Sequence, residues 1–313
     1  MADGRLTKLD FLPDVDFDEI LTNPILDIAA RFWDKNRYEA FRICYRSMRL
    51  IDDLVDHRKS ESREMTVREK TQLKNAMHTW VQAMKDGDTS DDFRHELTGI
   101  IRTYRIPFWP WERLYKSMVY DLDNNGFTSI ISFLRYSEGA AIAPASIFMH
   151  LCGVRKIHGE YVEPEFDIRL AARPLAQFSY FVHIIRDFQK DHKSNLNYFA
   201  DDKLRKYNLS VEMLHDAACG APIPNSFRHL IAEYKKIADY YRTRARVVLD
   251  SILPSMKPRY QLSLEMIYSL YLQIFERIDS ENGNFSESEL NPSSEEIKAR
   301  IDRTISNFPP DGY

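Results

Sequence analysis

The sequence predicts an all-α protein. Only 10 of the 313 residues are glycine, 29% are charged, and Leu, Ile, Ala, Arg, Lys and Glu dominate, a composition typical of helices and not of a turn-rich sheet protein. Apolar residues also recur at spacings of three and four through most of the chain, which is the period of a helix with one buried face.

The apolar period sets where the helices are expected. They are predicted at about 24–57, 66–86, 91–104, 108–124, 127–153, 166–192, 210–218, 225–252, 257–279 and 294–306. The links between them contain proline, glycine or asparagine, which end helices.

The domain organisation follows from the shortness of these links. A length of 313 residues allows one domain or two, but no flexible linker divides the chain and no fixed-period repeat is present. We therefore expect an N-terminal extension at 1–20, one helical domain at 21–281 and a polar tail at 282–313 that contains the short helix predicted at 294–306. The two polar ends are expected to be the most mobile parts.

Charge and cysteine content exclude several classes of protein. The net charge is −4 and basic residues are interspersed with acidic ones, which argues against a nucleic-acid partner. Cys44, Cys152 and Cys219 are far apart and flanked by apolar residues, as expected for reduced thiols in the cytoplasm. No signal peptide and no apolar run of ~18 residues is present. We expect a soluble cytoplasmic protein, and peripheral membrane contact stays open.

A first acidic stripe lies in the segment FRICYRSMRLIDDLVD (41–56). At about 100° per residue, Tyr45, Arg49, Asp52 and Asp56 fall within an arc of roughly 60°, with Asp53 at its edge. Like charges four residues apart cost roughly 0.2–0.5 kcal/mol in an isolated helix. Taken alone, the stripe is equally well explained by arginine neutralising the carboxylates on a solvated face.

A second stripe in HIIRDFQKD (183–191) favours a binding site. Asp187 and Asp191 repeat the four-residue spacing, with His183 one turn earlier and Phe188 among the apolar neighbours. Two acidic strips on mostly buried helices are costly unless they share cations. Carboxylates suit Mg²⁺, with Mn²⁺ as a second option, and Mg²⁺ bridges to phosphates. Because no glycine-rich phosphate loop is present, the pattern predicts a diphosphate held through the metal.

Three segments resemble the squalene/phytoene synthase family of head-to-head prenyl transferases. They are YRSMRLIDDLVD (45–56), RYSEGAAIAPASIFMHLCG (135–153) and QFSYFVHIIRDFQKD (177–191), within a similarity that runs from about residue 24 to 279. The resemblance implies an all-α isoprenoid synthase fold, a single helical bundle around a central cavity. It also implies that two molecules of farnesyl or geranylgeranyl diphosphate join through a cyclopropyl intermediate.

The resemblance also implies roles for individual residues. The metal-binding set is Asp52, Asp53, Asp56, Asp187 and Asp191; the catalytic set is Tyr45, Arg49, Tyr136 and Tyr271; and the substrate-binding set is Arg49, Gln177, His183, Arg186 and Tyr198. A purely structural role stays open for some of these positions. The two tyrosines Tyr136 and Tyr271 are equally well explained as core residues, and the small residues from Gly139 to Ala145 as a close helix contact.

Departures from the family pattern leave several questions open. His183 replaces a usual asparagine, Leu196 replaces an arginine, and residues 22–26 replace a His-Ser-x-Ser-Phe segment. Imidazole suits a hard cation less well than an amide oxygen, so we expect neutral His183 to hydrogen-bond Asp187 or the diphosphate. A class I terpene cyclase and a non-catalytic scaffold of the same fold are the alternative functions. The sequence does not indicate substrate length, final product, oligomeric state or whether NADPH takes part.

Overall fold

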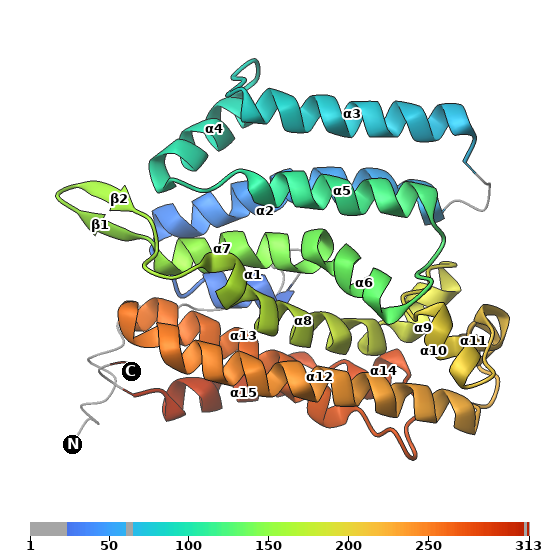
Figure 1. Ribbon diagram of the computed structural model, residues 1–313. Coiled ribbons are helices and arrows are strands. Elements are labelled where there is room, and N and C mark those ends of the chain that lie inside the picture. The colour runs from blue at the N-terminus through green and yellow to red at the C-terminus, as the bar shows by residue number, and fades with distance from the viewer. Residues whose placement is uncertain (1–23, 61–64, 310–311, 313) are drawn as a thin grey trace, which may run out of the picture.

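Almost all elements of the structure are α-helices, and the long ones run side by side across the molecule (Figure 1). This computed structural model describes residues 24–60, 65–309 and 312. In chain order the elements are α1 (Pro24–Ala30), α2 (Lys35–Ser60), α3 (Val67–Lys85), α4 (Asp92–Tyr104), α5 (Trp109–Asp123), α6 (Ile130–Ser137), the π-helix η3 (Glu138–Ile142), α7 (Ala143–Gly153), β1 (Arg155–Ile157), β2 (Glu160–Val162), α8 (Ile168–Arg186), α9 (Phe188–Lys193), α10 (Asp201–Lys206), α11 (Val211–Ala218), α12 (Asn225–Ile252), the 3-10 helix η4 (Leu253–Ser255), α13 (Pro258–Arg277), α14 (Glu287–Leu290) and α15 (Ser294–Asn307).

The predicted all-α class is confirmed, and every predicted helix has a counterpart. Three predicted helices are interrupted: 24–57 by the turn before α2, 127–153 by η3, and 166–192 at Asp187. The short elements α10, α14 and the β1–β2 hairpin were not predicted. The hairpin turns at His158 and Gly159, both with positive φ, and its strands are too short to show an alternating pattern.

Helix α8 forms the centre of the core, with α12, α7 and α13 packed around it. Its Phe178 and Phe181 are fully buried, and Phe181 makes an edge contact with buried Tyr234 of α12 at 5.7 Å between ring centroids. Burying an aromatic side chain of this size stabilises the fold by roughly 1.5–3 kcal/mol. These contacts hold α8 in a fixed position between its neighbours.

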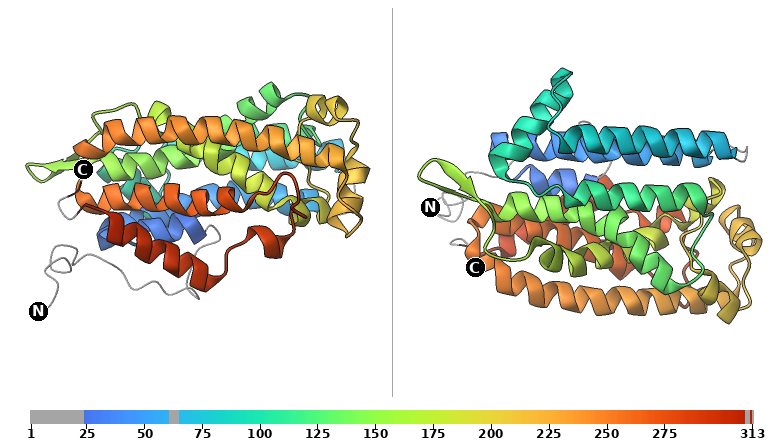
Figure 2. Two further views of the ribbon diagram at one scale, coloured as in Figure 1. Left: turned by 90° about the horizontal axis from the view of Figure 1, so that it is seen from below. Right: turned by 45° about the horizontal axis from the view of Figure 1, so that its top comes forward.

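The carboxyl ends of α2, α5 and α8 meet at one end of the bundle, beside α9 and α10 (Figures 1 and 2). Helix α5 packs against both α2 and η3. Because acidic residues occur near the ends of all three helices, this arrangement determines which side chains share one environment.

The π-helix η3 packs very closely against α5 at Gly139. A Cβ atom on Gly139 would lie 2.1 Å from the carbonyl oxygen of Arg113 and 2.3 Å from Oγ of Ser117. Ser117 Oγ donates a hydrogen bond of 2.7 Å to the carbonyl of Tyr136. At Gly139, therefore, the structure supports close helix packing, and this packing also fixes the backbone of Tyr136.

The polar tail contains α15, the helix predicted at 294–306, and α15 packs against α13. Ile301 and Phe308 are buried in this contact, and Arg300 Nε donates to Ser269 Oγ at 2.9 Å. The predicted extension at 1–20 and residues 22–23 of the departing segment lie outside the described residues. Within the part of the chain that the structure describes, none of the helices is both long and apolar enough to span a bilayer.

The tight contact at Gly139 gives a prediction. Replacing Gly139 with alanine should lower stability by about 1–3 kcal/mol, because backbone atoms of α5 must move to admit the methyl group. Gly99 is the matched control, since it lies on the exposed side of α4 with no atom within 4 Å of an added Cβ. Gly99→Ala should raise stability by about 0.5–1 kcal/mol. Thermal unfolding of both variants measures this, and equal melting temperatures would contradict the packing argument.

Candidate functional site

The last turns of α2 place two carboxylates beside a buried apolar face. Met48, Ile51 and Val55 are buried in the core, which fixes the rotation of the helix. Asp52 and Asp56 lie one turn apart on the adjoining face and are partly buried. The apolar residues of α2 therefore determine where its acidic stripe points.

Arg49 is bonded to the carboxylates of its own helix. Its Nη1 donates to Asp52 Oδ2 at 2.5 Å and its Nη2 donates to Asp53. The side chain of Asp53 is 58% exposed, against 26% for Asp52. Burial lowers the pKa of Arg49, but the two aspartates and, to a smaller extent, Tyr45 one turn earlier raise it above its usual value.

Helix α5 adds a third carboxylate, Asp121, that the sequence analysis did not single out. Asp121 is almost fully buried. Its Oδ1 accepts a hydrogen bond from Lys59 Nζ at 3.0 Å and its Oδ2 accepts one from the hydroxyl of Tyr136 at 2.5 Å. The predicted catalytic tyrosine thus has an acidic partner and not a purely apolar one.

The two partly buried carboxylates of α2, Asp52 and Asp56, are incompletely neutralised. The pKa of Asp52 is raised to about 7, mainly by burial. The negative charges of Asp56 and Asp121 also raise it, and their combined effect is larger than the lowering by Arg49. Burial and Asp121 likewise raise the pKa of Asp56 above its usual range. Crowded negative charge of this kind, which raises carboxylate pKa values, is typical of a site that binds a cation.

The second strip divides into one neutralised and one uncompensated carboxylate. Arg186 Nε donates to Asp187 Oδ1 at 2.6 Å. Although burial raises the pKa of Asp187, His183 and Arg186 together hold it below its usual value. Burial and Asp187 raise the pKa of Asp191 to about 7, and Asp56 of the first strip contributes to the rise. The two strips therefore lie close enough to repel each other.

His183 uses both of its ring nitrogens within its own helix. Nε2 lies 3.0 Å from Asp187 Oδ2, and Nδ1 lies 2.8 Å from Nη2 of Arg186. Because the guanidinium can only donate, Nδ1 accepts, and the proton sits on Nε2 and is donated to Asp187. Burial and Arg186 lower the pKa of His183 to about 4, so the ring is neutral at pH 7. The expected hydrogen bond to Asp187 is present.

Tyrosines fill the space between the two strips. Burial raises the pKa of Tyr180 and of Tyr198 well above the usual value. Asp121 and Asp191 contribute to the rise at both tyrosines. The Tyr198 ring lies 6.4 Å from that of Tyr180, and the Tyr136 ring lies 5.0 Å from Phe127. We refer to Asp52, Asp56, Asp121, Asp191, Tyr136, Tyr180 and Tyr198 as the acidic cluster.

The remaining predicted residues lie at different distances from this cluster. Tyr271 of α13 is buried and close enough to Arg186 to raise its pKa. Gln177 donates from Nε2 to Ser137 Oγ at 2.6 Å, one helical turn before Tyr180. Tyr180, and not Gln177, thus lies among the carboxylates. The spacing of Tyr180, His183 and Asp187 on one helical face was the sequence signal for it.

The donor chemistry of the acidic cluster fits Mg²⁺ as a partly hydrated ion. Within residues 24–60, 65–309 and 312, no group of three or more His, Cys, Asp or Glu side chains is close enough to hold one metal ion. Mg²⁺ usually binds through one or two carboxylates and completes its shell with waters and substrate phosphates. The carboxylates with raised pKa values, Asp52, Asp56 and Asp191, offer ligands of this type, and Asp187, whose pKa is lowered, offers a weaker one.

A comparison with sequence models of known families identifies the family of this chain. The sequence model of squalene/phytoene synthase matches residues 27–297. The chain belongs to the squalene/phytoene synthase family. The matched range contains all five predicted metal-binding aspartates of the two motifs as well as Asp121 and the three tyrosines of the acidic cluster.

Solved structures confirm the fold of this squalene/phytoene synthase family member. A dehydrosqualene synthase in complex with a ligand aligns with a TM-score of 0.69 at 14% identity, covering 91% of this chain and 92% of that one. The squalene synthase HpnC from Alicyclobacillus acidocaldarius aligns with a TM-score of 0.63 at 13% identity, covering 97% and 94%. TcSQS in complex with the ligand E5700 gives 0.62 at 14% identity, covering 96% and 86%. No curated protein sequence matches the chain.

The raised pKa of Asp52 gives a prediction for stability. Between the unfolded pKa near 4 and the folded pKa of about 7, the folded state binds the proton more tightly, so ionisation of Asp52 destabilises the fold as the pH rises. Asp52→Asn should therefore be more stable than the wild type at pH 8 without metal. The gain should be on the order of 2 kcal/mol, because a shift of one unit corresponds to about 1.4 kcal/mol and the charge is shared among coupled carboxylates.

The measurement is urea unfolding of both proteins at pH 5 and pH 8 in the presence of a chelator. The difference between variant and wild type should be largest at pH 8. Because His183 and His192, both with a pKa lowered to about 4, are present in both proteins, their opposite effect on stability cancels. A difference that is the same at both pH values would contradict the raised pKa.

Proposed function

We propose that this protein condenses two prenyl diphosphates head to head with release of diphosphate, in a reaction that depends on Mg²⁺, with Mn²⁺ as a substitute. The observation that carries the proposal is the acidic cluster, in which Asp56 of α2 contributes to the raised pKa of Asp191 of α9 and buried Asp121 contributes to the raised pKa of Asp56. Family membership and the fold shared with a dehydrosqualene synthase, the squalene synthase HpnC and TcSQS support the same reaction class. The substrates proposed are farnesyl or geranylgeranyl diphosphate, and the product is a squalene- or phytoene-type precursor.

Asp52, Asp56 and Asp191 would hold Mg²⁺, each ion through one or two of these carboxylates and otherwise through waters and phosphate oxygens. When bound, Mg²⁺ supplies positive charge that stabilises the leaving diphosphate as the carbon–oxygen bond ionises and its electron pair departs with the oxygen. Binding also relieves the repulsion among the three carboxylates, which are then fully ionised. The energy stored in the metal-free cluster thus favours cation binding.

Two cationic side chains of α2 would contact the diphosphate. Arg49 spans Asp52 and Asp53, and Lys59 pairs with Asp121. Once a cation neutralises the carboxylates, both side chains have donors available for phosphate oxygens, which charged donors bind strongly. Lys59 thereby supplies a positive charge in a chain that has Leu196 where the family has an arginine.

The aromatic side chains would protect a carbocation from water. Tyr136, Tyr180 and Tyr198 are neutral, because burial raises the pKa of each well above the usual value. Phe133 lies 5.2 Å from Tyr180 between ring centroids. Neutral aromatic faces attract positive charge and exclude nucleophilic water. The chain itself needs no covalent nucleophile for this reaction.

The two alternative functions predict different products. A class I terpene cyclase would release a cyclic hydrocarbon or alcohol with the carbon number of one substrate molecule, and a non-catalytic scaffold would release no diphosphate. Mass spectrometry of the lipid fraction after incubation with each prenyl diphosphate and Mg²⁺ distinguishes all three. Failure to form a product with twice the carbon number of the substrate would contradict the proposed condensation.

Carboxylates inside and outside the acidic cluster should differ in their effect on activity. Asp52→Asn and Asp191→Asn should each lower kcat/KM by about a hundredfold or more, because each removes a proposed cation ligand. Asp53→Asn is the matched control, since this neighbouring carboxylate is mostly exposed and bonded to Arg49; it should retain activity within about threefold. The rate of diphosphate release measures all three, and equal losses at Asp52 and Asp53 would contradict the assignment.

His183 should be replaceable by the asparagine usual in the family. Because both ring nitrogens are engaged by Asp187 and Arg186, the histidine offers no free lone pair to a metal. We expect His183→Asn to keep Mg²⁺-dependent activity. Assays with Mg²⁺ and Mn²⁺ in parallel measure this, and a complete loss, or a change of preference from Mn²⁺ to Mg²⁺, would show that the imidazole ligates the metal.

A further inference from the structure

A surface on α12, far along the chain from both acidic motifs, combines positive charge with exposed apolar side chains. Lys236, Tyr240, Arg244 and Val247 follow one another at spacings of four, four and three, so they lie on one stripe of the helix. Tyr240 and Val247 are 60% and 61% exposed. Lys236 and Arg244 are exposed and make no hydrogen bond or ion pair within the part of the chain that the structure describes. We call these four residues the α12 stripe.

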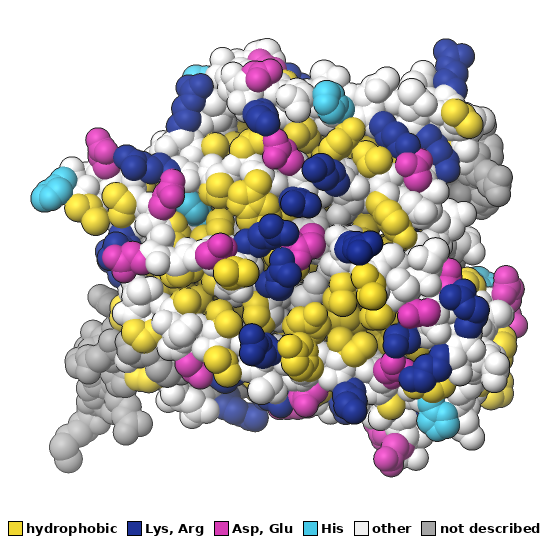
Figure 3. Space-filling view, in the orientation of Figure 1, with side chains coloured by type: hydrophobic (Ala, Val, Ile, Leu, Met, Phe, Trp, Pro, Cys, Tyr) yellow, Lys and Arg dark blue, Asp and Glu magenta, His cyan; other side chains and the backbone are white. Residues whose placement is uncertain are grey.

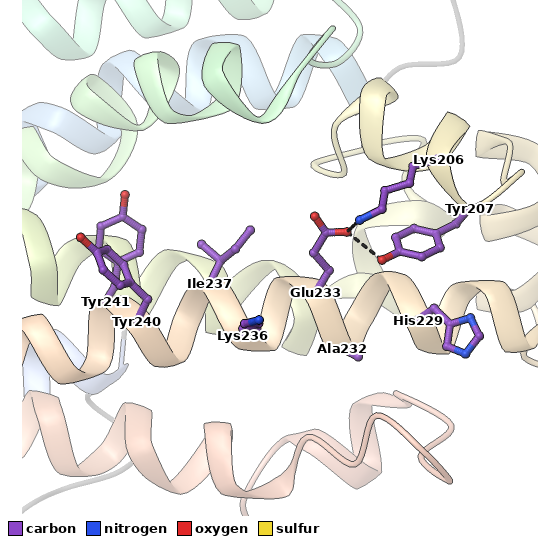
Figure 4. Close-up of a pocket in the computed structure, with 9 residues that line it drawn as sticks. All are labelled: Lys206, Tyr207, His229, Ala232, Glu233, Lys236, Ile237, Tyr240 and Tyr241. Atoms are coloured by element: carbon purple, nitrogen blue, oxygen red, sulfur yellow. Dashed lines mark hydrogen bonds and ion pairs between the residues drawn. The ribbon is translucent and has the colours of Figure 1, made fainter.

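A groove of about 800 Å³ runs beside the α12 stripe towards α10 (Figure 4). Its apolar wall includes Ile237 and Tyr241. Its only carboxylate among the lining residues, Glu233, is 2.7 Å from Lys203 Nζ, from Lys206 Nζ and from the hydroxyl of Tyr207. Two lysines therefore neutralise one glutamate, which leaves the groove with an excess of positive charge.

The same excess continues onto α8. Arg169 and Arg173 both pair with the single carboxylate of Glu138 at 2.6 Å. Arg173 is close enough to influence the pKa of Tyr241 of α12, which joins the two helices into one surface. Leu170, between the two arginines, is 63% exposed. Figure 3 shows dark blue and yellow side chains interspersed over α8 and α12 on this side of the molecule.

The charge of this surface is opposite to that of the whole chain, whose net charge is −4. The α12 stripe, the residues that line its groove and the paired arginines of α8 include Arg169, Arg173, Lys206, Lys236 and Arg244 against Glu138 and Glu233, and Lys203 of α10 also pairs with Glu233. The nearest further acids on α12, Asp239 and Asp250, are bonded to Arg242 and Arg246. The complement of such a surface is anionic.

The pattern within the stripe favours a lipid surface over a protein partner. The centre of a protein interface is depleted of charged residues, whereas here cationic and apolar side chains alternate along one line. Such a mixture, with tyrosine and long basic side chains, suits the headgroup region of a bilayer, where apolar groups insert and cations contact phosphates. Each Lys or Arg near an anionic leaflet contributes about 1 kcal/mol.

We infer that the α12 stripe, with the groove and the arginines of α8, docks this protein on a bilayer that contains anionic phospholipids. The α12 helix then lies along the headgroups, with Tyr240 and Val247 directed into the interface and Lys236 and Arg244 on the phosphates. This inference is independent of the proposed condensation, because none of its residues belongs to the acidic cluster.

The test is co-sedimentation of the full chain with vesicles, without substrate or metal. Vesicles of phosphatidylcholine with phosphatidylserine should retain the protein, vesicles of phosphatidylcholine alone should not, and raising the salt from about 0.1 M to about 0.5 M should release it. Lys236→Glu with Arg244→Glu, and separately Tyr240→Ser with Val247→Ser, should each lower partitioning by about tenfold or more.

A matched control comes from α3, where Val67 is 83% exposed and Arg68 follows it. Val67→Ser with Arg68→Glu makes one apolar and one charge change of the same kinds and should leave partitioning unchanged. No retention by the anionic vesicles, equal retention by neutral vesicles, or an equal effect of the α3 control would overturn the inference. So would light scattering that shows a dimer lost on Tyr240→Ser with Val247→Ser, because that would assign the surface to a second copy of the chain.

Discussion

Mutual repulsion of buried carboxylates is the constraint around which this end of the bundle is organised. Asp52, Asp56 and Asp191 come from two helices distant in sequence, and burial raises the pKa of each. The fold accepts this cost because the buried apolar face of α2 and buried Phe188 of α9 hold both helices in place. An energetically unfavourable cluster maintained by a favourable core is typical of a functional site.

The structure also shows that aspartates at equivalent positions of the two motifs differ in their ion pairs and exposure. Asp187 and Asp191 have the same spacing as Asp52 and Asp56, yet only Asp187 is paired with Arg186 and accepts a hydrogen bond from neutral His183. On α2, Arg49 holds exposed Asp53 and partly buried Asp52 together. The second strip therefore contributes one strongly acidic position to the cluster, and the replacement of asparagine by His183 is compensated within its own helix.

Sequence reasoning succeeded where the signal was local and periodic. The helices and the two acidic stripes depend on residue spacing within a single element, which the sequence displays directly. Asp121 was missed because a single aspartate in α5 gives no sequence signal. Its role is evident only from its contacts with Tyr136 and Lys59, which lie on other helices. Tyr180 was passed over for Gln177, although its position one turn from His183 marks the same face. The break at η3 could not be read either, because it depends on contact between Gly139 and α5.

Proton release on metal binding tests the central claim most directly. In a weakly buffered solution at pH 6.5, Asp52 and Asp191, with pKa values of about 7, should be largely protonated, and Mg²⁺ must displace these protons to bind. The account predicts that addition of Mg²⁺ acidifies a solution of the wild-type protein and that Asp52→Asn with Asp191→Asn abolishes the effect. Binding of Mg²⁺ without proton release, or release that persists in the double variant, would contradict it.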